Sequence, residues 1–239
     1  MTDDASEALV YDTHSYLAQR EGWRARTRLA FFASPHARAV FDLVRHSVTD
    51  FVYGMSGRSW ETAPHADYYV GLQTAYLRTQ GLVLDLARDC EVIDGATLLR
   101  RQIEVIARLR ELDEIEDLSE LLKRTPNVNA LKSPVRALYG SYSEIAHSSV
   151  DYVFDLLASG EAGFEQWVSV YPKFTPNSHV LFQNAAVVHL EFLLWVRDLG
   201  DRTGIAIERH YVDGSFAELV EALNAWATDP EAATSSRRS

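Results

Sequence analysis

Apolar residues recur every three or four positions along most of this chain, the spacing that places side chains on one face of an α-helix. Leu98, Leu99, Ile103, Ile106 and Leu109 show the pattern most clearly. It predicts six or seven helices, at about residues 15–33, 35–54, 64–86, 94–109, 134–158, 177–200 and 216–227. A further short acidic helix is compatible with residues 115–124. The alternation with period two that marks strands is nearly absent.

Signals for helix starts support these boundaries. Ser34-Pro35 and Ser133-Pro134 each combine a capping side chain with a proline at the first helical position. Ser215 is predicted to open the last helix, because a glutamate follows three residues later in the spacing of a capping box.

Two segments depart from the helical pattern. Residues 160–176 hold glycines, prolines and several aromatic residues, which predicts an aromatic loop that packs over the bundle. Residues 205–212 alternate weakly and predict one short extended piece. Since no internal repeat or low-complexity linker is present, we predict an all-α fold: a single helical bundle over residues 1–228, followed by a flexible tail over 229–239.

Composition narrows the class of protein. The chain has 239 residues, 47% of them hydrophobic and 24% charged, which is typical of a globular protein that needs no disulfide or zinc. Cys90 is the single cysteine, so an intramolecular disulfide and a cysteine-rich zinc site are excluded. The acidic start lacks the features of a secretory signal, and polar residues interrupt the apolar stretch 180–196. We expect a cytoplasmic protein without membrane contact.

The formal net charge of −11 argues against broad binding of DNA or other nucleic acid. The charge is uneven, because arginines crowd residues 20–45 whereas residues 111–120 are acidic. Such runs are usually solvated faces, and an anion-binding early region is the alternative. A small anion site built from Arg100, Arg101 and Arg136 is compatible with this balance.

Two predicted helices carry polar stripes that a bundle can bring together. On the later helix, Tyr139, Ser143 and His147 step by four and share one face, and Glu144 lies one turn before His147. On the earlier helix the stripe consists of Arg101, Glu104 and Arg108.

Three interpretations of these stripes differ in chemistry. A histidine beside a carboxylate can act as a general base while an arginine stabilises developing negative charge, as in phosphodiester cleavage by internal attack. The candidate catalytic residues are then His147, Arg101, Glu104 and Tyr139, and the candidate binding residues are Arg100, Arg136, Ser143 and Glu144. Alternatively, the same groups bind a ligand without catalysis, or they pair with one another and fix the helix register.

Glu144 and His147 also match the Glu-x-x-His spacing of di-iron helical bundles. Those sites need two such motifs and two further glutamates, and this chain has no second Glu-x-x-His. We therefore predict no metal site and no cofactor.

The stretches Leu98-Leu-Arg-Arg-Gln-Ile-Glu104 and Tyr139-Gly-Ser-Tyr-Ser143-Glu-Ile-Ala-His147 resemble a group of bacterial all-helical proteins of unknown function. The shared pattern is an Arg-x-x-Glu helix followed by a Tyr-x-x-x-Ser-x-x-x-His helix, over about residues 65–200. In outline the group is similar to the HEPN superfamily. HEPN nucleases carry an Arg-x4-6-His motif, whereas the residues at that spacing before His147 are Gly140, Ser141 and Tyr142.

This resemblance implies two alternatives. HEPN-like folds that lack the arginine act as binding or dimerisation modules, so we expect a helical interaction or ligand-binding protein, with a homodimer as one expected assembly. The alternative is a metal-independent, HEPN-like ribonuclease of a toxin or defence system that acts on RNA or a nucleotide. His147 would then be the general base, and Arg100 or Arg101 would supply the missing guanidinium. The chemistry of the residues favours the interaction or ligand-binding protein over the ribonuclease.

Overall fold

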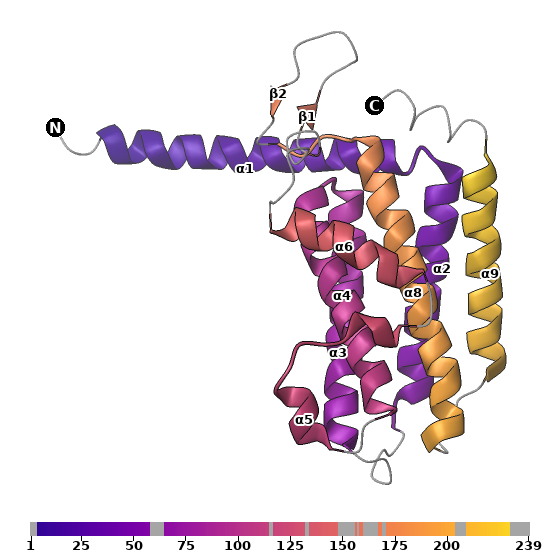
Figure 1. Cartoon of the computed structure of the whole chain (residues 1–239). Helices are drawn as coiled ribbons and strands as arrows, with labels where there is room; N and C mark the ends of the chain where they lie inside the picture. Colours follow the sequence, from indigo (N-terminus) through magenta and orange to yellow (C-terminus); the bar gives the residue numbers. More distant parts are fainter. Residues whose placement is uncertain are drawn as a thin grey trace.

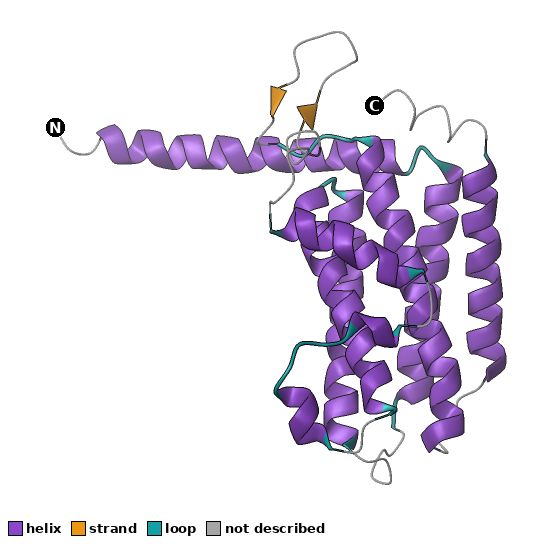
Figure 2. Ribbon diagram, in the orientation of Figure 1, coloured by secondary structure: helices purple, strands orange, loops and turns teal. Residues whose placement is uncertain are grey.

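Helices dominate the computed structural model of the chain (Figures 1 and 2). The structure describes residues 4–57, 65–114, 117–131, 134–147, 156, 158–159, 167–168, 171–203 and 209–229; side chains are described from residue 15 onward, except over 158–168 and 200–209. Ser133, the first part of the predicted aromatic loop and all of the predicted tail except Asp229 lie outside these residues.

The all-α fold class is confirmed, with eight α-helices in the described residues where six or seven were predicted. These helices are α1 (Asp4–Phe31), α2 (Pro35–Met55), α3 (Ala66–Arg88), α4 (Val92–Leu112), α5 (Leu118–Leu122), α6 (Val135–Ala146), α8 (Pro176–Thr203) and α9 (Arg209–Thr228). The remaining elements are a 3-10 turn, η1 (Val128–Ala130), and two short antiparallel strands, β1 (Ala158–Ser159) and β2 (Trp167–Val168).

Helix α4 lies inside the bundle and packs against α3, α6 and α8 (Figure 1). On the other side of α8, helices α2 and α9 pack against each other and against α8. The core where α3, α4 and α8 meet contains the fully buried side chains Tyr76, Leu99, Ile103, Phe192 and Trp195. Burial of this apolar surface is the main source of stability, because helices in proteins owe most of their stability to the packing of an apolar face.

Helix α1 crosses one end of the bundle, across the direction of the other long helices (Figure 1). Its arginines pair with acidic residues at the corner between α3 and α4: Arg20 and Arg24 contact Glu91, and Arg28 holds Asp89 through two hydrogen bonds of 2.7 and 2.6 Å. Burial raises the pKa of Asp89, but the hydrogen bonds and charges of Arg28 and Arg88 together outweigh this effect, so the pKa is lowered. These three arginines of the basic region are therefore matched by carboxylates of the same chain.

Helix α6 is shorter than the sequence pattern predicts. The helix predicted to reach about Ala158 ends at Ala146, where His147 caps it and donates its backbone N–H to the carbonyl of Ser143. Ala158 instead pairs with Val168 in the small β-hairpin. Two serines follow His147 in the sequence, and serine is a weak helix former that competes for backbone hydrogen bonds.

Helix α9 begins earlier than predicted. The prediction of an extended piece over 205–212 is wrong for residues 209–212, because α9 starts at Arg209. Ser215 lies within this helix and does not cap it. The buried residues Val212, Leu219 and Trp226 are spaced by seven, so one face of the helix already points inward before Ser215. By contrast, Ser34 caps α2 as predicted, since its hydroxyl accepts a hydrogen bond from the N–H of Ala37.

Part of α8, from Pro176 to Leu199, is long and apolar enough to cross a membrane, the one such helix among the described residues. Most of this stretch is buried by the surrounding helices (Figure 1), which is also the pattern of a bundle's core helix.

Helices α4 and α8 approach closely at Gly95. A Cβ atom at this position would lie 2.5 Å from Cδ2 of Leu181, which is itself 2% exposed. The close approach therefore depends on the absence of a side chain.

We expect Gly95→Ala to destabilise the fold by about 1–3 kcal/mol, since overpacking a buried contact outweighs the gain in helix propensity. Gly81→Ala is the matched control, because Gly81 is exposed on α3 and a Cβ there meets nothing within 4 Å. That control should raise stability by about 0.5–1 kcal/mol. Urea unfolding followed by circular dichroism measures both, and equal stabilisation by the two substitutions would contradict the close contact.

Candidate functional site

The structure brings part of the predicted polar cluster together between α4 and α6. Arg100 and Glu104 lie one turn apart on α4, Tyr139 projects from α6, and His147 stands at the C-terminal end of α6. We call these four residues the Arg100 cluster. Arg100, Glu104 and Tyr139 are half-buried, and His147 is exposed.

Arg100 contacts every other member of the cluster. Its Nη1 lies 3.0 Å from Nε2 of His147, and its Nη2 lies 3.1 Å from Oε1 of Glu104 and 3.4 Å from the Tyr139 hydroxyl. The Tyr139 hydroxyl donates to the same Glu104 oxygen at 3.0 Å. The guanidinium also sits over the Tyr139 ring, 5.5 Å from its centre. The cluster is thus internally paired, and it ties α6 to α4.

The protonation pattern follows from these contacts. The hydrogen bond with Tyr139, together with the charge of Glu104, raises the pKa of Arg100, so this side chain stays cationic. Because a guanidinium only donates, Nε2 of His147 is the acceptor and carries no proton in this arrangement. Glu104 neutralises Arg100, so an external anion would have to compete with an existing ion pair.

Several predicted site residues lie outside the Arg100 cluster. Arg101, the predicted catalytic arginine, is exposed and forms no hydrogen bond or ion pair within the described part of the chain; Arg100 takes the expected place. Arg136 and Glu144 are exposed on α6, and Ser143 is half-buried there. Arg108, grouped with Arg101 in the sequence, is buried and pairs with Glu111 instead.

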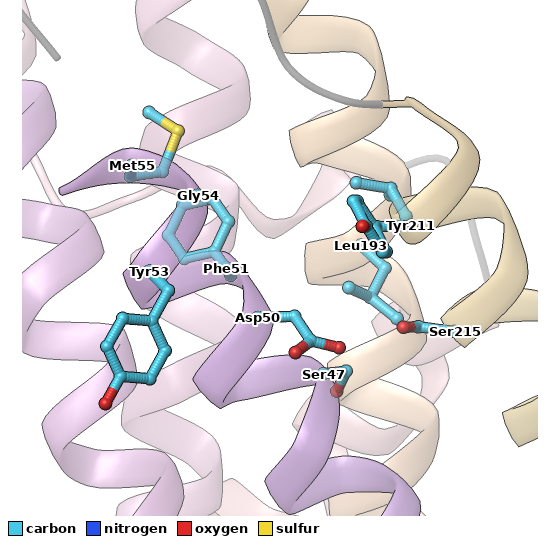
Figure 3. Close-up of a pocket in the computed structure, with 10 residues that line it drawn as sticks. Ser47, Asp50, Phe51, Tyr53, Gly54, Met55, Leu193, Tyr211 and Ser215 are labelled. Atoms are coloured by element: carbon cyan, nitrogen blue, oxygen red, sulfur yellow. The ribbon is translucent and has the colours of Figure 1, made fainter.

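A cavity of about 310 Å³ lies elsewhere, between the end of α2, the middle of α8 and the start of α9 (Figure 3). Its walls are mostly apolar and aromatic. The lining residues are Ser47, Asp50, Phe51, Tyr53, Gly54 and Met55 of α2, Leu193 of α8, and Tyr211, Val212 and Ser215 of α9. We call this space the α2–α9 cavity.

A few polar groups interrupt its apolar lining. Figure 3 shows the Asp50 carboxylate directed from α2 toward α9, where the Ser215 hydroxyl lies. Tyr211 lies one turn before Ser215 on the same helix. An apolar cavity with few polar groups is the usual form of a site for a small organic molecule.

The cavity wall is connected to a buried polar network through Ser47, which is 4% exposed. The Ser47 hydroxyl lies 2.6 Å from Nε2 of His189, and Nδ1 of that ring lies 3.0 Å from the Tyr76 hydroxyl. Tyr76 in turn donates to the side-chain oxygen of Gln80, which also accepts from Gln102 at 2.6 Å. Both nitrogens of His189 therefore have partners although the ring is fully buried.

Burial lowers the pKa of His189 to about 3, because no described acidic group faces the ring and the charged form loses its hydration. The same burial raises the pKa of Tyr76 well above its usual value. At neutral pH both side chains are uncharged. His189 is therefore a poor general base for Ser47, and the pair is a fixed hydrogen bond rather than a catalytic dyad.

The sequence pattern does not indicate the α2–α9 cavity. Its lining comes from three segments far apart in the chain, and the last of them was predicted to be extended. A weak signal exists on α2, where Ser47 and Asp50 are one turn apart beside Phe51.

No three histidine, cysteine, aspartate or glutamate side chains in the described ranges are grouped so that they could hold a metal ion.

No protein-family profile matches the chain, and neither a curated protein nor a solved structure is significantly similar to it.

The pKa of His189 predicts a specific dependence of stability on pH. Its folded-state pKa of about 3 lies below the ordinary 6.5, so between these values the unfolded chain binds a proton that the folded protein does not. The contribution is fully present above pH 6.5 and is lost as the pH falls, by up to about 1.4 kcal/mol per pH unit.

Between pH 6.5 and 4, the free energy of unfolding of His189→Gln should therefore fall less per pH unit than that of the parent chain. His46→Gln, at an exposed position on α2, is the control and should leave the slope unchanged. Denaturant midpoints at several pH values measure the slopes, and equal slopes for the parent chain and His189→Gln would refute the assignment.

Proposed function

We propose that this chain is a non-catalytic helical protein that binds a small organic molecule in the α2–α9 cavity. The observation that carries the proposal is the cavity itself: about 310 Å³, lined by aromatic and aliphatic side chains and a few polar groups. This size is at the lower end for ligand sites and suits a molecule with one aromatic ring.

The Arg100 cluster supports a non-catalytic role. Its arginine, glutamate, tyrosine and histidine are paired with one another, which is the expected outcome for a structural contact between helices. It also lies on α4 and α6, neither of which lines the cavity. The cluster's role in this proposal is to hold α6 in place.

A neutral aromatic probe tests the proposed function. We expect 2-phenylethanol to bind the parent chain and to shift the NMR signals of Phe51, Leu193 and Tyr211. Ser215→Phe fills the cavity and should weaken this binding at least tenfold. Ala217→Phe places the same side chain at an exposed position on α9 and should bind as the parent does.

The proposal fails if the probe binds neither the parent chain nor the control, or if Ser215→Phe and Ala217→Phe bind it equally well. Circular dichroism of each variant establishes that the helices remain folded.

One observation favours a second candidate function, an HEPN-like ribonuclease. The guanidinium that the α6 motif lacks is present in space, because Arg100 from α4 lies 3.0 Å from Nε2 of His147. In this function Arg100 would move onto a substrate phosphate and leave Nε2 free to accept a proton from the attacking 2′-hydroxyl. The ion pair with Glu104 opposes that movement, which is why we rank this function second.

If the ribonuclease function holds, His147→Ala and Arg100→Ala should each reduce cleavage of a fluorescent RNA at least a hundredfold, and induction of these variants should relieve growth inhibition by the parent chain. Arg101→Ala, one residue along the same helix, should cleave normally. Absence of cleavage and of growth inhibition by the folded parent chain would rule this function out.

A further inference from the structure

Asp50 is the one charged side chain among the described residues that line the α2–α9 cavity. It is exposed, and it forms no hydrogen bond or ion pair with any part of the chain that the structure describes. Figure 3 shows its carboxylate turned toward α9 rather than along its own helix. The cavity therefore has a negative group at its wall that the described protein does not neutralise.

We infer that the ligand of this cavity is an organic cation, a small primary amine with an aromatic or branched apolar body. This inference rests on the proposed function, because it names the chemical class of the molecule bound there. An ammonium group would pair with Asp50, and its remaining hydrogens would find an acceptor in the Ser215 hydroxyl across the cavity.

The rest of the lining suits the same class of molecule. Phe51 and Tyr211 contribute aromatic rings from two different helices, and aromatic faces attract cations as well as apolar groups. Leu193 and Val212 are buried and provide the apolar surface against which the body of the ligand would pack.

The negative charge of Asp50 disfavours anionic ligands. A carboxylate or phosphate ligand would approach Asp50 against the repulsion between like charges. The net charge of −11 acts in the same direction over longer distances, because it attracts cations and repels anions.

Three ligands of nearly equal shape test the inference: 2-phenylethylamine, 2-phenylethanol and 3-phenylpropionate. Titrations of the full chain at pH 7 and low salt should show the amine binding at least tenfold more tightly than the alcohol, with no binding of the carboxylate. Asp50→Asn should remove the preference for the amine and leave binding of the alcohol unchanged. Asp42→Asn, an exposed acid on α2 outside the cavity, should keep the preference.

Each other outcome overturns the inference. Equal binding of amine and alcohol by the parent chain would leave the proposed function intact and reject the cationic ligand. A preference for the amine that Asp42→Asn reduces as much as Asp50→Asn would assign it to the general field of the protein rather than to this carboxylate. Failure of all three ligands to bind would reject both the inference and the proposed function.

Discussion

The structure depends on the complete burial of one half of α4. Every residue from Val105 to Leu112 is buried, and the charged residues Arg108, Arg110 and Glu111 are among them. Charges removed from water must be paired with good geometry. Arg110 binds Asp198 of α8 at 2.8 Å, while Arg108 and Glu111 hold the loop that follows α5. Apolar contacts pack the helices together, and the polar contacts of Arg108, Arg110 and Glu111 fix the positions of α8 and that loop against α4.

The same constraint separates the two candidate sites. Arg100 lies on the less buried half of α4, and it too is matched, by Glu104 on its own helix and by Tyr139 on α6. The α2–α9 cavity lies on the far side of α8, where α4 forms no wall. Asp50 is the one charged side chain among the described residues of this cavity, and none of the chain's described groups pairs with it. The paired cluster already accounts for its own charges, whereas the exposed Asp50 carboxylate is open to an incoming cation.

The sequence predicted the fold class because helical periodicity is a local property that survives packing. It also predicted which residue types meet between α4 and α6, since steps of three and four fix the face of each helix. It could not distinguish Arg100 from Arg101, because neighbouring residues differ by about 100° around a helix and the relative rotation of two helices is set by tertiary packing. The cavity was hidden for a similar reason: Ser47, Leu193 and Tyr211 meet only after three helices have packed.

Ser47 connects the cavity with the core and limits what the cavity can do. Its hydroxyl is held by His189 at 2.6 Å, and that ring is held from the other side by Tyr76. Because burial keeps His189 uncharged at neutral pH, the ring has one donor and one acceptor, and the two hydroxyls already occupy both. A ligand that displaced Ser47 from His189 would leave a buried nitrogen unpaired, at a cost of about 1–3 kcal/mol. Ser47 therefore acts as a fixed part of the cavity wall, so under the proposed function Asp50 and Ser215 would recognise the polar group of the ligand.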